Sequence, residues 1–167
     1  MGHCEIDPFA NKSYQAMHQP KEGEWFEKDI SKVSADSIPD VHLWTAGFPC
    51  QDASASGKRA GIHGARTGLF FEFVRLLRER GENKPRWLIL ENVKGLFSVG
   101  GTGDFAEVLC ELASLGYGVE YALLDSRAFG VPQHRERIYF VGDFTGRSTG
   151  KILSFRTTDT KTLEQII

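Results

Sequence analysis

Cysteine is scarce in this sequence, with three residues among 167. Cys4, Cys50 and Cys110 show no paired spacing, and their number is odd. A disulfide framework needs cysteines in pairs, and a structural zinc site needs clustered Cys and His ligands. The sequence therefore indicates a protein of a reducing compartment, and it predicts no metal site.

Long apolar runs and a targeting leader are missing as well. No stretch approaches the roughly 20 apolar residues that a transmembrane helix needs. The start, Met1-Gly2-His3-Cys4-Glu5, lacks the basic and apolar leader of a secretory signal. We therefore expect a cytoplasmic protein that does not enter a membrane.

An excess of positive charge is also absent. The net charge is −2, whereas a nucleic-acid-binding domain usually has a basic footprint. Any contact with nucleic acid must therefore come from local groups of basic residues. The sequence offers two such groups, the first with Lys58, Arg59 and Arg66 and the second with Arg127, His134, Arg135 and Arg137.

The remaining composition is that of a globular domain, with 41% hydrophobic and 25% charged residues. Strand-like and helix-like segments alternate, which predicts an α/β fold with a mostly parallel sheet. Asp7-Pro8 should begin a helix over 9–17, Thr67 should cap a second helix, and Asp104 with Glu107 should open a third that ends at Gly116. The expected strands are 41–46, 87–90, 119–124 and 137–141. The apolar stripe of the second helix is Leu69, Phe70, Phe73, Val74 and Leu77.

Three polar stretches adjoin these apolar runs. Gly47-Phe48-Pro49-Cys50-Gln51 follows 41–46, Glu91-Asn92-Val93 follows 87–90, and Gln133-His134-Arg135-Glu136-Arg137 leads into 138–141. A cysteine, a carboxylate and two arginines thus stand at the edges of predicted strands. Each alone has a plainer interpretation: Cys50 as a buried small apolar residue, Glu91 as a helix N-terminal acid, and the arginines as surface charges.

Taken together and in this order, the stretches resemble the PCQ, ENV and QxRxR motifs of the cytosine-5 DNA methyltransferase family. Asp29-Ile30 and Thr67-Gly68-Leu69-Phe70-Phe71 also match, so the resemblance covers about residues 3–143. It implies a Rossmann-like methyltransferase sheet with one antiparallel strand near its edge. It also implies S-adenosyl-L-methionine as methyl donor, double-stranded DNA as substrate, and a restriction-modification or phage-type enzyme acting in the cytoplasm.

The chemistry of cytosine explains this set of residue types. C5 is a poor nucleophile, and a thiolate adding to C6 makes it enamine-like. Cys50 is the expected nucleophile, with Arg135 and Arg137 favouring its thiolate. A buried Glu91 would keep or share a proton at N3, and Arg137 would hold O2 and orient Glu91. The target base must leave the duplex to reach these groups.

The cofactor is expected at the carboxyl ends of the strands. By the resemblance, Glu5 would accept hydrogen bonds from the ribose hydroxyls and Ile6 would pack on the adenine. The full set of expected cofactor residues is Glu5, Ile6, Asp29, Ile30, Pro49 and Leu69.

Residues 52–66 hold three glycines and two serines, a composition that predicts a mobile loop. This segment resembles the family's loop that closes over DNA. Ala53 departs from the family pattern, which usually has an aromatic residue there, so the packing of the loop is in question rather than the chemistry. The residues expected to contact DNA are Gln51, Ser54, Ser56, Lys58 and Arg59.

Two parts of the family pattern have no counterpart in this sequence. One is the first strand with its glycine-rich FxGxG loop, and the other is the target recognition region. We therefore expect residues 1–143 to form a partial catalytic domain with an incomplete sheet, and 144–167 to be a connector toward the missing region. Open strand edges would favour a complementary chain or self-association.

Three alternatives stay open. The same motifs also fit an RNA cytosine-5 methyltransferase. The chain could instead be an inactive fragment or subunit that needs a complementary chain. A cysteine hydrolase using Cys50 with His63 or His134 would leave Glu91 and the arginines without roles.

Overall fold

The computed structural model describes residues 1–49, 68–97, 103–148 and 150–153. The elements follow the order β1 (Gly2–Cys4), α1 (Pro8–His18), β2 (Trp25–Glu27), η1 (Ile30–Lys32), η2 (Ala35–Ser37), β3 (Leu43–Gly47), α2 (Leu69–Glu79), η5 (Gly81–Asn83), β4 (Trp87–Val93), η6 (Lys94–Phe97), α3 (Gly103–Ser114), β5 (Gly118–Asp125), η7 (Ser126–Phe129) and β6 (Glu136–Asp143), where η denotes a 3₁₀ helix.

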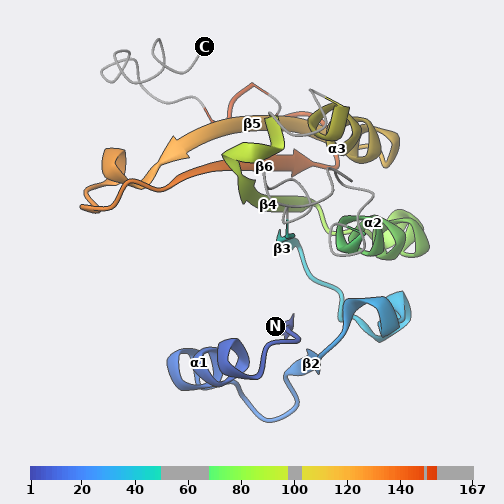
Figure 1. Cartoon of the computed structure of the whole chain (residues 1–167). Coiled ribbons are helices and arrows are strands. Elements are labelled where there is room, and N and C mark those ends of the chain that lie inside the picture. The colour runs from blue at the N-terminus through green and yellow to red at the C-terminus, as the bar shows by residue number, and fades with distance from the viewer. Residues whose placement is uncertain (50–67, 98–102, 149, 154–167) are drawn as a thin grey trace.

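The larger sheet has four strands in the order β3-β4-β6-β5 (Figure 1). β3 and β4 are parallel, whereas β6 is antiparallel to both of its neighbours, β4 and β5. Three of the four strands therefore point the same way. The predicted α/β class is confirmed, and the single antiparallel strand is β6, next to the edge strand β5.

The first two strands form a separate parallel pair, with Gly2 opposite Trp25 and Cys4 opposite Glu27. Helix α1 connects them, and Asp7 caps it as predicted by accepting hydrogen bonds from the backbone N–H groups of Phe9 and Ala10. Among the described residues, β1 pairs only with β2, and β3 pairs only with β4. The parallel strands are thus divided over two sheets, which confirms the predicted interruption.

Helices α2 and α3 cover one face of the four-stranded sheet (Figure 1). The core between them includes Leu88 and Leu90 of β4 and Ile138 and Phe140 of β6, all fully buried. The predicted stripe of α2 needs one correction, because Leu76 is buried while Leu69 at the helix start is only partly buried. The residues that α2 buries are Phe70, Phe73, Val74, Leu76 and Leu77.

The structure agrees with only some of the predicted helix ends. α3 stops before Gly116, which has a φ of +90° and so adopts a conformation that glycine favours. Asp104 lies inside the first turn of α3 rather than ahead of it, so it is not the predicted N-cap. Gly68 precedes the first turn of α2, and Thr67 lies outside the described residues.

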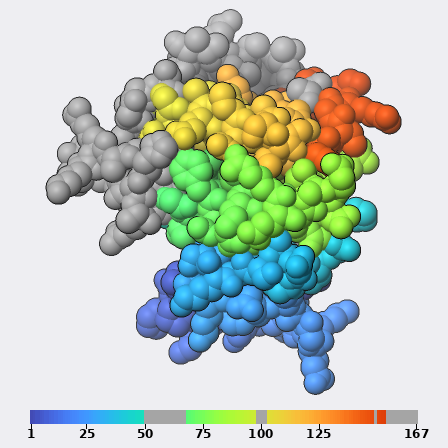
Figure 2. Space-filling view, turned by 90° about the vertical axis from the view of Figure 1, so that its right-hand side faces the viewer, coloured from blue at the N-terminus to red at the C-terminus, as the bar shows by residue number. Residues whose placement is uncertain are grey.

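The small sheet is joined to α2 by the segment that follows β2. Figure 2 shows α3 (yellow), α2 (green) and this segment (blue) side by side. Arg75 of α2 donates hydrogen bonds to the carbonyls of Ile30 and Val33, at 3.2 and 3.0 Å. Val33, Ala35 and Leu76 form a second buried cluster beneath this contact. Ile30, a predicted cofactor residue, is therefore held against α2 through its backbone carbonyl.

Within the described residues, no helix combines the length and apolar character needed to cross a membrane. The same residues contain no group of three or more His, Cys, Asp or Glu side chains that could hold a metal ion.

Candidate active site

Glu91 and the two predicted arginines come together on the sheet face opposite α2 and α3. Nε of Arg137 lies 2.8 Å from Oε1 of Glu91, and Nη2 of Arg135 lies 3.8 Å from the same oxygen. Glu91 is opposite Tyr139 in the β4–β6 register, so Arg137 is a diagonal neighbour on β6. Two chain segments more than forty residues apart are thus joined at one carboxylate oxygen.

The Glu91 carboxylate is less buried than the sequence predicted. Its side chain is 33% exposed. Along β4, Leu88, Leu90 and Asn92 are buried, and the residues between them turn to the opposite face. The apolar run before Glu91 therefore buries its own side chains against the helices and leaves the carboxylate reachable from solvent.

Asn92 connects this carboxylate to the end of β3. Its side chain is almost fully buried, with 1% of the residue exposed. Nδ2 donates a hydrogen bond to the carbonyl oxygen of Phe48 at 3.1 Å, and Oδ1 accepts one from the backbone N–H of Val93 at 2.7 Å. The backbone that leads into Pro49-Cys50 is therefore held by the residue next to Glu91.

Gly47 gives the carboxylate room. It is opposite Glu91 in the β3–β4 register. A Cβ at this position would lie 3.4 Å from Oε2 of Glu91. Side chains longer than alanine would press on the carboxylate from the β3 side.

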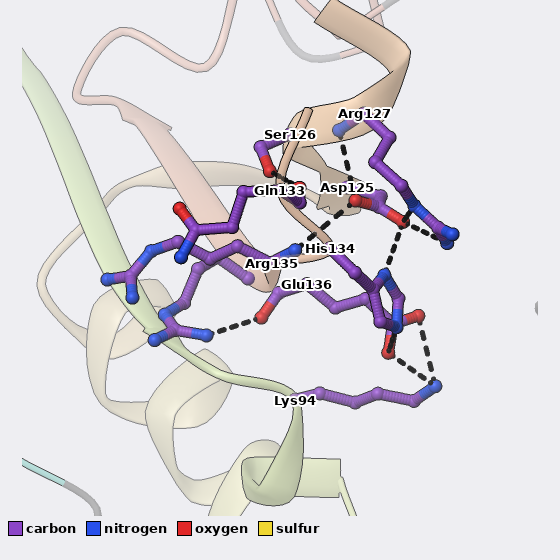
Figure 3. Close-up of polar contacts among 9 residues, drawn as sticks. Lys94, Asp125, Ser126, Arg127, Gln133, His134, Arg135 and Glu136 are labelled. Atoms are coloured by element: carbon purple, nitrogen blue, oxygen red, sulfur yellow. Dashed lines mark hydrogen bonds and ion pairs between the residues drawn. The ribbon is translucent and has the colours of Figure 1, made fainter. Parts of the chain in front are cut away.

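A polar network surrounds the loop between β5 and β6 (Figure 3). Asp125 accepts hydrogen bonds from Arg127 and is in contact with His134, whose Nδ1 lies 2.8 Å from Oδ2. Nζ of Lys94 lies 3.1 Å from both carboxylate oxygens of Glu136. This network borders a concave region of about 390 Å³, which is lined by Val93, Lys94, Gly95, Gln133, His134, Arg135, Glu136 and Arg137.

The predicted cofactor acids lie at the carboxyl ends of two adjacent parallel strands. Glu5 follows β1, and its backbone N–H donates to the carbonyl of Glu27 on β2 at 3.1 Å. Asp29 follows β2 and caps η1 through Ser31. Burial, followed by the charges of Asp29, Glu27 and Glu5, raises the pKa of the Cys4 thiol. The two acids therefore share one local environment, where a sheet ligand is expected.

The apolar members of the predicted cofactor set are also placed. Ile6 is 72% exposed, which leaves its side chain available to pack on a planar ring. Pro49 follows Phe48 in the chain, and Leu69 precedes Phe70. The rings of Phe48 and Phe70 contact each other, with their centroids 5.0 Å apart. The end of β3 and the start of α2 are thus close together, whereas Glu5 and Asp29 follow strands of the other sheet.

Several predicted residues lie outside the described part of the chain. These are the nucleophile Cys50, the DNA-contacting residues Gln51, Ser54, Ser56, Lys58 and Arg59, and His63 of the hydrolase alternative.

The family model described as C-5 cytosine-specific DNA methylase matches residues 1–166. The chain belongs to this family. The match extends over the motifs from which the resemblance was drawn, so the predicted family is confirmed.

Three curated relatives within this methylase family come from two bacteria and a phage. Type II methyltransferase M.BsuFI of Bacillus subtilis is 41% identical over 138 residues, which is 83% of this chain and 32% of the relative. Type II methyltransferase M1.ScrFI of Lactococcus lactis subsp. cremoris is 42% identical, with coverage of 83% and 34%. Orphan methyltransferase M.Rho11sI of Bacillus phage rho11s is 39% identical, with coverage of 85% and 27%. The chain spans about a third of the length of these relatives.

Solved structures agree on the methylase fold. Entamoeba histolytica methyltransferase EhMeth superposes with a TM-score of 0.69 at 23% identity, covering 86% of this chain and 44% of that one. S. pombe Dnmt2 methyltransferase gives a TM-score of 0.61 at 24% identity, with coverage of 85% and 41%.

Sequence reasoning missed three residues that organise this site. Asn92 was noted only as part of a motif, although a polar residue that continues the alternate spacing of Leu88 and Leu90 is a signal for a buried hydrogen bond. Asp125 directly follows a predicted strand, and nothing nearby in the sequence indicates its partners. Lys94 gave no signal, because its partner Glu136 is 42 positions away.

Proposed function

We propose that this chain is the catalytic part of a DNA (cytosine-5-)-methyltransferase of the restriction-modification or phage type. The observation that carries the proposal is the Glu91 carboxylate, held by Arg137 at 2.8 Å and joined through Asn92 to the strand end that precedes Cys50. The family description names DNA and so favours it over the RNA alternative. The bacterial and phage relatives support action on DNA in the bacterial cytoplasm.

The proposed reaction divides among four side chains. The Cys50 sulfur would bond to C6 of a flipped cytosine, and C5 would take the methyl group from the sulfonium of bound S-adenosyl-L-methionine. C5 would then lose its proton to solvent as the bond between C6 and the Cys50 sulfur breaks, which releases Cys50. Glu91 lies on the open face of the sheet and engages N3. Arg137 fixes Glu91 and holds O2, and Arg135 adds positive charge beside the same carboxylate.

S-adenosyl-L-methionine supplies an electrophilic methyl group when bound. The chain's residues fit its adenosine part, since Glu5 and Asp29 lie at adjacent strand ends and Ile6 offers an exposed apolar side chain. Glu5 would bind the ribose, Ile6 the adenine face, and Asp29 with Ile30 the adenine edge. Pro49 and Leu69 would line the remainder.

We further propose that residues 51–59 contact DNA through Gln51, Ser54, Ser56, Lys58 and Arg59. Residues 1–143 would form the partial catalytic domain, and 144–167 the connector toward a recognition region. The start of this connector is attached to β5, because the Glu120 carboxylate accepts hydrogen bonds from the backbone N–H groups of Lys151, Ile152 and Leu153.

Covalent trapping tests the proposed function. The purified chain is mixed with S-adenosyl-L-methionine and a duplex that carries a mechanism-based cytosine analogue, and the adduct is detected as a stable band on a denaturing gel. We expect an adduct with the unaltered chain and with Cys110→Ser, a matched control because Cys110 is an exposed cysteine on α3. Cys50→Ser should form none. An adduct that survives Cys50→Ser, or is lost in Cys110→Ser, contradicts the assignment.

A second candidate is a chain that works only with a complement. The observation that favours it is the division of the parallel strands, with one edge of β1 and one of β3 unpaired among the described residues. Their backbone groups must bond to water or to another strand. If this candidate holds, the trapping reaction needs a second polypeptide that supplies a strand, and adding that polypeptide restores the adduct.

A further inference from the structure

The loop between β5 and β6 presents Arg135 to the site without an apolar anchor. Residues 127–135 of this loop are all exposed, and the large apolar side chains of the loop, Phe129 and Val131, are 58% and 46% exposed. Arg137 differs from Arg135, because it lies in β6 and is fixed by pairing with β4 and β5. The position of Arg135 must therefore depend on polar contacts within the loop.

Asp125 makes more of these polar contacts than any other side chain of the loop. Oδ1 accepts hydrogen bonds from the backbone N–H groups of Arg127 and Arg135, at 3.0 and 3.4 Å. Oδ2 accepts from Nε and Nη2 of Arg127, at 2.8 and 2.7 Å, and lies 2.8 Å from Nδ1 of His134. One carboxylate at the end of β5 thus holds both the outgoing and the returning ends of the loop, as Figure 3 shows.

Two hydrogen bonds from Ser126 also hold the two ends of the loop together. The backbone N–H of Ser126 donates to the carbonyl of Arg135 at 3.2 Å, and the Ser126 hydroxyl donates to the carbonyl of Gln133. Hydrogen bonds from Arg127 hold the pKa of Asp125 well below its usual range, so the carboxylate is charged at neutral pH. The Asp125 side chain is only 11% exposed.

We propose that Asp125 is a positioning residue that sets Arg135 beside Glu91, while Arg137 takes its place from the sheet alone. The inference rests on the proposed function for its consequence in catalysis, but the placement of Arg135 can be tested without it. The two arginines of one motif are therefore held in different ways, Arg135 by polar contacts within the loop and Arg137 by strand pairing.

The placement is tested by NMR of the arginine side-chain N–H groups. Glu91→Gln removes the charge that both arginines face, so it should shift the Nε–H signals of Arg135 and Arg137 in the otherwise unaltered chain. In an Asp125→Asn background, the amide keeps one acceptor but no longer attracts Arg127 and His134. There Glu91→Gln should shift only Arg137.

Two outcomes overturn the proposal. One is an Arg135 signal that still responds to Glu91→Gln in the Asp125→Asn background. The other is loss of both responses, which would mean that Asp125 supports the sheet and not the loop. Asp36→Asn, at an exposed acid of η2, is the matched control and should leave both responses intact.

Affinity for DNA tests the consequence. The probe is a fluorescein-labelled duplex with an abasic site opposite one cytosine, which makes that cytosine easy to flip. Asp125→Asn should raise Kd about fivefold to tenfold, and less than about twofold when Arg135 is already alanine. Equal losses in both backgrounds contradict action through Arg135. If the unaltered chain does not bind the probe, it does not act on DNA by itself, and the NMR result alone decides on Asp125.

Discussion

Replacing Asn92 with aspartate tests how the site is held together. The two side chains have nearly the same shape, but the carboxylate cannot donate to the carbonyl of Phe48 when it is charged. In the native chain that hydrogen bond is 3.1 Å long and lies in a position that is 1% exposed. At neutral pH the variant therefore directs a carboxylate oxygen at a carbonyl oxygen in a buried site.

The size of the effect follows from burial. Asn92→Ala leaves the Phe48 carbonyl and the Val93 N–H without their partner, which costs about 1–3 kcal/mol of stability. Asn92→Asp adds the cost of a poorly solvated charge. A folded-state pKa raised by about 2 units corresponds to about 2.7 kcal/mol. We therefore expect Asn92→Asp to be at least as destabilising as Asn92→Ala at pH 7.

Acid should reverse the defect of Asn92→Asp. The folded-state pKa of the introduced carboxyl group would be raised above its unfolded value of about 3.9, so below about pH 4 the group is protonated in both states. The neutral acid can donate to Phe48 and accept from Val93, as asparagine does. As the pH rises above about 4, the deficit relative to the native chain should grow by up to about 1.4 kcal/mol per unit until the folded-state pKa is reached.

The assay is urea unfolding at several pH values, followed by tryptophan fluorescence and by far-ultraviolet circular dichroism. Stability is compared with the native chain at each pH, which cancels the acid sensitivity of other groups. Asn83→Asp is the matched control, because Asn83 lies in the exposed η5 turn. A deficit of Asn92→Asp that does not change with pH would refute the proposed hydrogen bond to Phe48.

Three further predictions concern chemistry, acid stability and assembly. Glu91→Gln in a chain competent for methyl transfer should lower kcat far more than DNA affinity, and equal losses would point to a structural role. Asp143 is fully buried, and although burial raises its pKa, hydrogen bonds from the following turn outweigh this and lower the pKa to about 2. Its contribution of about 2 kcal/mol should therefore be lost as the pH falls from about 4 to about 2, and urea unfolding of Asp143→Asn should lack this loss. The isolated chain should self-associate through β1 and β3 and bind S-adenosyl-L-methionine weakly; a monomer by light scattering with micromolar affinity by calorimetry would contradict this.

Much of the local structure could be predicted from the sequence. Asp7-Pro8 defines the start of α1, because the cap and the fixed φ of proline act within one turn. The apolar stripe of α2 and the strand containing Trp87 follow from the spacing of apolar residues. The order of the three motifs indicated the family, because residue type and order can be read from the sequence without knowledge of contacts.

The burial of Glu91 was not predictable in the same way. The apolar run before it suggested a buried carboxylate, but alternation along β4 sends Glu91 to the face away from α2 and α3. Which face the helices cover depends on how they pack, and this is not a property of the run itself. Asn92, which looked secondary, is the residue that is buried there.

The contacts that build the site were decided only by the tertiary structure. Strand order and register bring Arg137 within 2.8 Å of Glu91, and parallel pairing of β3 with β4 brings Asn92 to the Phe48 carbonyl. A shift of one residue in either register would move these side chains to the other face. The sequence by itself determined which chemical groups are available and which helices and strands carry them. Their meeting depends on strand pairing between distant segments, because only long-range packing selects one register.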